Sequence, residues 1–229
     1  MYVLKDKLYL LAVILIDFCG DIIVSILRIF RASKFPPEVN NILVVRLDHI
    51  GDVVYSTCVP QNLKARYPQA RVDFLVANWA KELIINNPYI DEIICYDPPW
   101  FSRGGKKTAW FVSLLKLIVK LRKKRYDLGF DLRGDLKHIV LMWLAGIKFI
   151  VGYGITGGAF LLDRNVRYGE DAFAGHSLDL LKAIGIEPVI TQPRIYVLQE
   201  NEDFIADLYR LHGVSKDNFV AVIDRKSVV

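Results

Sequence analysis

The sequence predicts an α/β fold of the Rossmann-like class, built on a doubly wound parallel sheet. From Asn40 onward, short runs rich in β-branched residues alternate with segments of helical periodicity. Such alternation is typical of right-handed βαβ units, whose parallel sheet is covered on both faces. Of the 229 residues, 53% are hydrophobic and 12% are aromatic, which excludes a disordered chain and suits a large core.

The first segment, residues 1–34, is predicted to be an amphipathic helix lying in a membrane interface. Its apolar run, residues 8–30, is long enough to cross a bilayer. Asp17 and Asp21 interrupt the run, and each costs about 2.5 to 3.5 kcal/mol near the bilayer centre. On a helix these acids and Arg28 share one polar stripe, and basic residues flank the run on both sides. A helix packed on the protein itself and a true span are the alternatives.

The elements of the first domain follow a short linker. Residues 35–39 are the linker, because paired prolines cannot continue a helix. Residues 40–190 are the predicted N-terminal Rossmann-like domain. Its expected strands are 42–47, 72–76, 92–96, 128–132 and 149–153. Its expected helices are 53–66, 79–86, 108–124, 136–145 and 175–184, the last of which is ended by Gly185 as a C-terminal cap.

Residues 191–229 are predicted to begin a second α/β domain. A short extended piece is followed by the helix "QENEDFIADLYRLHGV", which has acidic residues in its first turn. The run "NFVAVI" is then the expected first strand of a new unit. A strand with no helix or partner strand after it cannot bury its faces, so we expect the sequence to be a fragment of a longer chain.

Composition restricts the partners and the cofactors. The net charge of +5 and the pI near 9.0 suit anionic partners such as lipid headgroups or phosphorylated sugars. The basic run 122–125 lacks the exposed aromatic residues typical of nucleic-acid readers, so no nucleic acid is expected. Cys19, Cys58 and Cys95 are expected to be reduced thiols of a cytoplasmic protein. The four histidines show no metal-ligand spacing, and no metal site is expected.

Three turns should meet at the carboxyl edge of the sheet, where ligands of this fold bind. They follow the first, third and fourth strands, at residues 48–52, 97–107 and 131–137. In the first turn, Gly51 permits close approach of the backbone. The amides of Val53 and Val54 are expected to open a helix whose N-terminus attracts negative charge.

The polar residues of these turns each admit two interpretations. Asp52 is either a helix N-cap or a general base held within reach of a substrate hydroxyl. His49 either binds phosphate or assists proton transfer, or it is simply solvated. Asp131, Arg133 and Asp135 form either a structural ion-pair cluster or a site for sugar hydroxyls and phosphate. The residues alone leave these alternatives open.

Five separated blocks of the sequence resemble glycosyltransferase family 9, the lipopolysaccharide heptosyltransferases. The blocks are "ILVVRLDHIGDVVYSTCVPQNLKARYPQARVDFLV", "NPYIDEIICYD", "YDLGFDLRGDLK", "FIVGYG" and "LDLLKAIGI", in the family's order and spacing over residues 40 to about 223. The resemblance implies the N-terminal, acceptor-binding half of a GT-B enzyme with two Rossmann-like domains. It further implies transfer of heptose from ADP-heptose to the lipopolysaccharide inner core, with inversion and without a required metal or other cofactor.

The resemblance also assigns residues. The aspartate of the family's Gly-Asp pair is Asp52, which becomes the expected catalytic base that deprotonates the acceptor hydroxyl. The residues expected to bind substrate are Asp48, His49, Gly51, Asp131, Arg133 and Gly134. The chain departs from the family at Cys58, where most members have proline, and at His176, whose shifted position carries no role over.

The expected protein is therefore an inverting glycosyltransferase, peripheral on the inner face of the bacterial inner membrane. Its expected partners are a nucleotide-sugar donor, a lipid-linked glycan acceptor and an anionic membrane surface. Without the donor-binding domain, the chain is expected to bind donor weakly and to be inactive by itself. One alternative is a non-catalytic, membrane-docked module that binds sugar or lipid. Another, a dinucleotide oxidoreductase, is disfavoured because no G-x-G-x-x-G motif follows the first strand.

Overall fold

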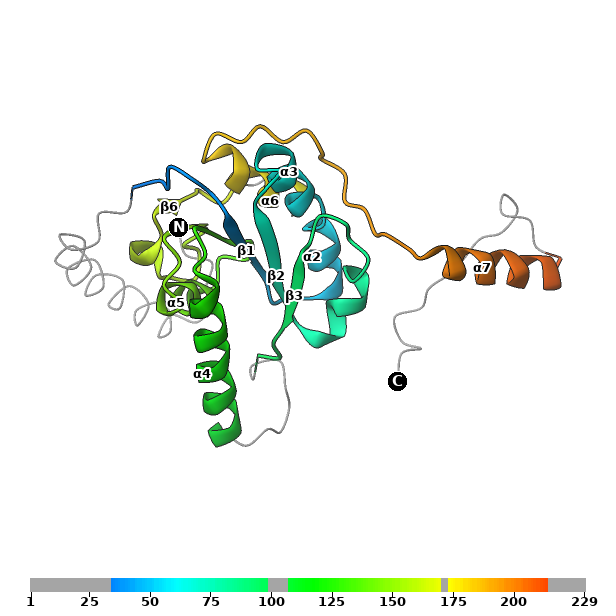
Figure 1. Cartoon of the computed structure of the whole chain (residues 1–229), viewed down its shortest axis with the longest axis horizontal. Coiled ribbons are helices and arrows are strands. Elements are labelled where there is room, and N and C mark those ends of the chain that lie inside the picture. Colours follow the sequence, from blue (N-terminus) through cyan, green and yellow to red (C-terminus); the bar gives the residue numbers. More distant parts are fainter. Residues whose placement is uncertain (1–33, 99–106, 170–172, 214–229) are drawn as a thin grey trace. The chain divides into compact units, whose positions relative to one another are not determined.

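The predicted sheet is present, and all of its strands are parallel (Figure 1). The computed structural model describes residues 34–98, 107–169 and 173–213. The order of the six strands is β3-β2-β1-β4-β5-β6. They are β1 (Asn41–Arg46), β2 (Arg71–Val76), β3 (Glu92–Cys95), β4 (Leu128–Asp131), β5 (Phe149–Gly152) and β6 (Arg164–Asn165). The chain order reverses between β1 and β4, which makes their shared edge the expected binding position in a doubly wound sheet.

The five predicted strands are confirmed, each end within one residue of its expected place, and the short β6 was not expected. The helices are α2 (Ile50–Tyr55), α3 (Cys58–Arg66), α4 (Lys107–Lys124), α5 (Leu136–Leu144), α6 (Phe173–Lys182) and α7 (Gln199–Leu211). Two short 3₁₀ helices, η1 (Asn78–Leu83) and η2 (Ala159–Leu161), complete the set. The expected helix over 79–86 is present as the shorter 3₁₀ helix η1. The C-terminal cap of α6 is confirmed, because Gly185 has φ of 78°.

The predicted single helix over 53–66 is wrong, because two helices occupy this stretch. The chain bends between α2 and α3 at Ser56 and Thr57. The Ser56 hydroxyl donates to the Asp52 carbonyl at 2.7 Å, and the Thr57 hydroxyl donates to the Val54 carbonyl at 2.7 Å. Hydroxyls that bond back to carbonyls of the preceding turn commonly bend a helix. The first helix also starts at Ile50, three residues earlier than expected.

Alternate residues of β1 point into two separate cores. Ile42 and Val44 pack on one face of the sheet, beneath α2, α3 and α6, while Leu43 and Val45 pack on the other, beneath α4 and α5. All four side chains are fully buried. A strand covered on both faces needs an uninterrupted apolar run, which is why this stretch shows no polar alternation.

Contacts divide the chain into residues 1–195 and residues 196–229. In the second unit, the described residues form α7, which has no buried side chain. No helix among the described residues is long and apolar enough to span a membrane. Three predicted features lie largely or wholly outside the described residues: the interfacial helix over 1–34, the turn 97–107 and the "NFVAVI" strand.

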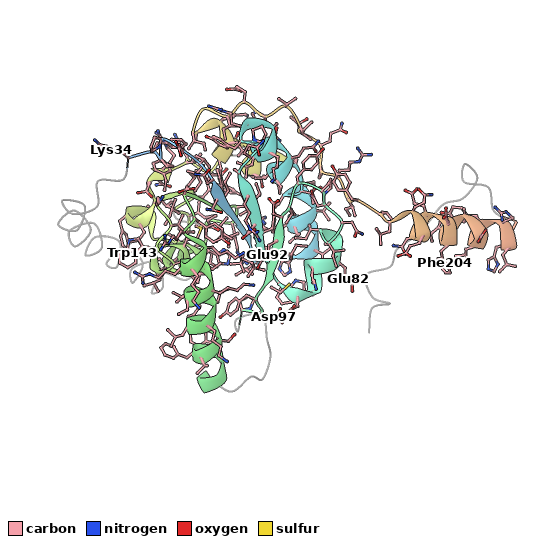
Figure 2. All side chains as sticks on the ribbon, viewed as in Figure 1. Lys34, Glu82, Glu92, Asp97, Trp143 and Phe204 are labelled. Atoms are coloured by element: carbon pink, nitrogen blue, oxygen red, sulfur yellow. The ribbon has the colours of Figure 1, made fainter. Side chains whose placement is uncertain are left out.

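Acid titration should weaken the fold through Glu92, the first residue of β3 (Figure 2). Lys124 hydrogen-bonds to this carboxylate and Lys120 pairs with it at 3.0 Å, which lowers its pKa from 4.5 to about 2. A depressed carboxyl pKa contributes stability above 4.5 that is lost as pH falls toward 2. We expect the Glu92→Gln variant to lose less unfolding free energy across that pH window than the unsubstituted protein does.

Urea unfolding at a series of pH values measures this difference. Glu187→Gln is the matched control, because Glu187 is exposed and stands outside the ion pairs found among the described residues. Equal slopes for Glu92→Gln and the unsubstituted protein between pH 4.5 and 2 would show that the lysines do not stabilise the carboxylate.

Candidate functional site

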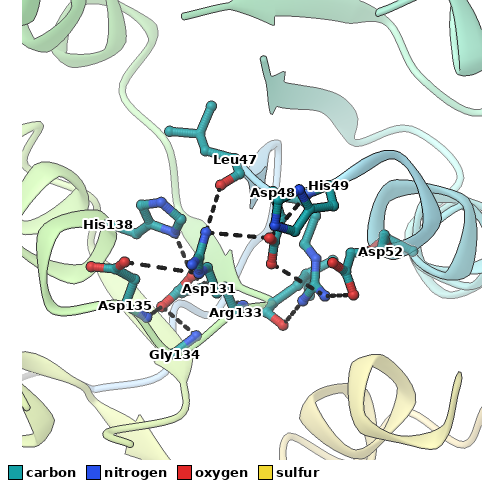
Figure 3. Close-up of polar contacts among 12 residues, drawn as sticks. Leu47, Asp48, His49, Asp52, Asp131, Arg133, Gly134, Asp135 and His138 are labelled. Carbon is teal, nitrogen blue, oxygen red and sulfur yellow. Dashed lines mark hydrogen bonds and ion pairs between the residues drawn. The ribbon is translucent and has the colours of Figure 1, made fainter. Parts of the chain in front are cut away.

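The turns after β1 and β4 meet at the carboxyl edge of the sheet, as predicted (Figure 3). The Arg133 guanidinium crosses between them: its Nη1 donates to the Leu47 carbonyl at 3.1 Å and lies 3.3 Å from Asp48 Oδ1. In the opposite direction, Arg46 Nη1 donates to the Leu132 carbonyl. Two arginines thus tie the two turns together.

Arg46 links the two acids of the first turn. Its Nη2 lies 3.0 Å from Asp52 Oδ1 and 3.6 Å from Asp48 Oδ2. The arginine is the last residue of β1, where a charged side chain follows four fully buried apolar ones. Sequence reasoning missed it, although a cation that ends an apolar strand next to two acids is a usable signal. Arg46 therefore fixes where the Asp52 carboxylate lies.

Asp52 is not the helix N-cap. The N-cap position belongs to His49, and Asp52 is the third residue of α2. The N-cap interpretation failed because it assumed that the helix begins at Val53. The carboxylate is instead turned toward Arg46, and its side chain is 23% exposed. Since the amide of Val53 donates to the His49 carbonyl at 3.1 Å, the expected anion site at that amide is also wrong.

Asp48 and His49 are adjacent in the first turn but differ in their exposure to solvent. Asp48 is buried, accepts the His49 amide at 2.9 Å and pairs with both arginines, so it acts as a structural counter-charge. His49 is exposed at the sheet edge. The structure brings both residues to the site, and the substrate-binding role of each remains a prediction.

Asp131 holds the second turn together. Its carboxylate accepts the amides of Arg133, Gly134 and Asp135 at 3.0 to 3.2 Å, and His138 Nδ1 lies 3.1 Å from Oδ1. The side chain is fully buried, so a substrate cannot reach it. Of the two interpretations of this residue, the structure favours the structural one. Sequence reasoning missed His138, because a histidine in the first turn of a helix has no spacing that marks it as a site residue.

The backbone conformation at position 134 requires a glycine. Its φ is 80°, and a Cβ atom built there would lie 2.8 Å from the Tyr153 carbonyl oxygen. Only glycine fits such a left-handed and crowded position. Arg133 beside it has a side chain that is 31% exposed and can reach a ligand. In this turn, the Arg133 side chain is therefore the group that a ligand can contact, and Gly134 permits the conformation of the backbone.

Two residues from distant segments complete the site. Tyr168 and His176 stack with ring centroids 4.1 Å apart, and both border the hollow that Asp52 faces. Burial raises the pKa of Tyr168; Arg46 opposes this effect, and the charges of Asp52 and Asp48 add to it. His176 is buried, and its carbonyl accepts a bond from the Tyr153 hydroxyl. Neither side chain was predicted to belong to the site.

The hollow has a volume of about 140 Å³ and combines acids with arginines. Its lining residues are Arg46, Asp48, Asp52, Leu132, Arg133, Tyr168, His176 and Ser177. Asp52 is its more open acid, because the Asp48 side chain is only 10% exposed. Chemically, Asp52 can accept a proton from a hydroxyl placed in the hollow, and Arg133 can bind an anionic oxygen.

Among the described residues, the side chains of this site form neither a metal-binding cluster nor a disulfide. Within the described residues, no group of three or more histidine, cysteine, aspartate or glutamate side chains could hold a metal ion. Cys58, which is buried, and Cys95, which is half-buried, are free cysteines.

Sequence comparison finds relatives that cover part of the chain. No protein-family model matches it. It is 30% identical over 129 residues to lipopolysaccharide heptosyltransferase 2 of Escherichia coli K12, covering 54% of this chain and 35% of the relative. It is 27% identical over 149 residues to the lipopolysaccharide core heptosyltransferase OpsX of Haemophilus influenzae, covering 63% and 39%. The chain thus spans little more than a third of the length of these relatives.

Solved structures share the fold. The glycosyl transferase family 9 protein from Veillonella parvula aligns with a TM-score of 0.64 at 18% identity, covering 82% of this chain and 55% of that one. The E. coli ADP-heptose lipopolysaccharide heptosyltransferase II aligns with a TM-score of 0.57 at 22% identity, covering 77% and 51%. The E. coli heptosyltransferase WaaC, solved with ADP-2-deoxy-2-fluoro heptose, aligns at 0.55 and 16%, covering 67% and 51%. The predicted α/β fold of a GT-B glycosyltransferase domain is confirmed.

Proposed function

Because the chain is heptosyltransferase-like in sequence and has the fold of glycosyltransferase family 9, we propose that it is the acceptor-binding part of an inverting glycosyltransferase. The proposed reaction moves a heptose or a related sugar from an ADP-sugar onto the lipopolysaccharide core or another cell-envelope glycan. The similarity to lipopolysaccharide heptosyltransferases supports the lipopolysaccharide acceptor, and the similarity to WaaC, solved with an ADP-heptose analogue, supports the donor class.

One observation carries the proposal: a partly exposed carboxylate is held in place at the ligand-binding edge of the sheet. Asp52 is kept there by Arg46 at 3.0 Å and faces a polar hollow. A base that abstracts a hydroxyl proton needs this combination of access and fixed position. The neighbouring acids Asp48 and Asp131 are less accessible than Asp52, because both are buried and engaged by other groups of the protein.

In the proposed reaction, the acceptor hydroxyl gives its proton to Asp52. The hydroxyl oxygen forms a bond to the anomeric carbon from the face opposite the diphosphate, and the bond from that carbon to the diphosphate oxygen breaks. The nucleoside diphosphate leaves with the electron pair, and the configuration at the anomeric carbon inverts. Arg133 stands where it could hold an anionic group of either substrate. No metal ion is required in this scheme.

The acceptor is proposed to be lipid-linked, which places the enzyme as a peripheral protein on the inner face of the inner membrane. The net charge of +5 supports this location, because anionic headgroups attract a basic protein. The donor is proposed to bind mainly to protein outside the Rossmann-like domain of residues 40–190.

The test is a transfer assay with the gene product as the cell makes it. ADP-heptose carrying a radioactive sugar is incubated with a lipopolysaccharide inner-core acceptor that lacks heptose. We expect label in the acceptor, inverted anomeric configuration by NMR, and an unchanged rate in EDTA.

Two results, from this assay together with binding measurements on the same protein, would contradict the proposal. Acceptor binding without any transfer from a panel of ADP-sugars would indicate the non-catalytic binding module. Saturable binding of NAD in place of ADP-sugars would indicate a dinucleotide enzyme instead.

A further inference from the structure

Helix α4 is apolar on two faces, and within the part of the chain that the structure describes only one of them packs on the protein. On the inner face, Leu117 and Leu121 are buried against the sheet. On the outer face, four apolar side chains are 45 to 54% exposed: Phe111, Val112, Leu115 and Val119. Residues 111, 115 and 119 follow one another at intervals of four, which places them on one stripe of the helix. An apolar face of a helix is normally buried against an apolar neighbour, and the outer face of α4 has none among the described residues.

The charge of α4 is uniform in sign. Its sequence, KTAWFVSLLKLIVKLRKK, contains six basic residues and no acidic one. Lys120 and Lys124 are engaged by Glu92. Lys116 and Lys123 are exposed, and the helical repeat places both beside the apolar stripe. Among the described residues, no acidic side chain forms an ion pair with either of these two lysines.

Apolar side chains bordered by lysines match the chemistry of an anionic membrane surface. Lysine stems lie along apolar surface while their ammonium groups reach the headgroups, and the apolar stripe enters the boundary with the acyl chains. Figure 1 shows the amino-terminal part of α4 extending beyond the sheet, and Figure 2 shows its side chains standing clear of the domain there. This end of the helix follows β3 and so lies toward the carboxyl edge of the sheet, the edge that holds Asp52.

We propose that the outer face of α4 is a membrane-docking surface that binds anionic lipid headgroups. Lys116 and Lys123 contact the headgroups, and the stripe of Phe111, Leu115 and Val119 inserts beneath them. Docking through this face holds the carboxyl edge of the sheet near the membrane, where a lipid-linked acceptor would present its glycan. The proposal rests on the peripheral location in the proposed function. The experiments that test it measure lipid binding, so the docking proposal can fail while the proposed sugar transfer is upheld.

Vesicle flotation of the full chain provides the first measurement. The vesicles contain either phosphatidylcholine alone or phosphatidylcholine with 30% phosphatidylglycerol, a composition on the order of natural anionic lipid contents. We expect Lys116→Gln/Lys123→Gln to weaken partition to the anionic vesicles about thirtyfold, from the loss of two lysines near the surface. Lys81→Gln/Lys182→Gln is the matched control: it removes the same charge from exposed positions on other helices and should change partition less than threefold.

A fluorophore on α4 separates this surface from any binding by other segments. Val112→Cys is labelled with an environment-sensitive dye in a Cys19→Ser/Cys95→Ser background, in which the buried Cys58 stays unlabelled. We expect the emission to shift to the blue on anionic vesicles and not on neutral ones, while a label at Lys81→Cys does not shift.

Three results would overturn the proposal. The label at position 112 fails to respond while the chain floats with the vesicles, which shows binding elsewhere. Its emission is already blue without lipid, which shows that another segment of the chain covers the stripe. Its shift follows protein concentration and not lipid, which shows that a second copy covers it.

Discussion

The Asp52→Asn variant should lose about a thousandfold in kcat for sugar transfer, the middle of the range for removal of a general base. The asparagine side chain keeps the size of the aspartate, and its carbonyl oxygen can still accept a bond from Arg46, which lies 3.0 Å from the carboxylate. The hollow should therefore keep its shape and its affinity for the acceptor. Only the capacity to take a proton is removed. Steady-state rates with saturating donor and acceptor measure the loss.

Asp135→Asn is the matched control for this prediction. Asp135 is another acid at the same edge of the sheet, but its carboxylate is the N-cap of α5 and accepts the Lys137 amide at 2.9 Å. Asparagine caps helices as well as aspartate does, so kcat should stay within about threefold. In this control, kcat should still decline at acidic pH, as in the unsubstituted enzyme. The residual kcat of Asp52→Asn should show no such decline. Wild-type turnover with an unchanged pH profile in Asp52→Asn would remove Asp52 from the role of base.

The sheet could be predicted because its signal is local. In β1, β2, β4 and β5 the apolar residues are buried on both faces, and such short runs stand out from the helices between them. The bend at Ser56 and Thr57 was not predicted, because helical periodicity continues across it. What breaks the helix is a pair of side-chain hydroxyl bonds to carbonyls, which the periodicity of a sequence does not report.

The candidate site was predicted only in part, because much of it is assembled from distant segments. The two turns at the carboxyl edge follow from the topology, and both are found there. Tyr168 and His176 reach the hollow through the packing of α6 and the segment before it, with no spacing signal in the chain. Arg46 was not predicted, although an arginine that ends an apolar strand just before two acids is positioned to pair with them.

The Asp131→Ala variant should lose about 3 kcal/mol or more of unfolding free energy. Three backbone amides and His138 Nδ1 converge on the Asp131 carboxylate, which is fully buried. Alanine would leave these donors without an acceptor in a space that water does not reach. Each buried donor without a partner costs about 1 to 3 kcal/mol, and relaxation of the turn recovers part of the sum. Urea unfolding with linear extrapolation measures the change.

Asp179→Ala is the matched control for the loss of stability. Asp179 forms one ion pair with Lys182 at 3.0 Å, and the side chain of the lysine is 53% exposed, so its removal should change the free energy by less than about 0.5 kcal/mol.

The two roles once open for Asp131 give opposite patterns in this experiment. A structural carboxylate predicts a large loss of stability together with a misplaced Arg133, whose amide it holds at 3.2 Å. A sugar-binding carboxylate predicts unchanged unfolding and a raised KM for the acceptor, because a residue that contacts only substrate leaves the free protein intact. No substrate atom can reach a fully buried side chain, so the first pattern is the expected one. Any effect of the substitution on sugar transfer should then arise from displacement of the Arg133 side chain.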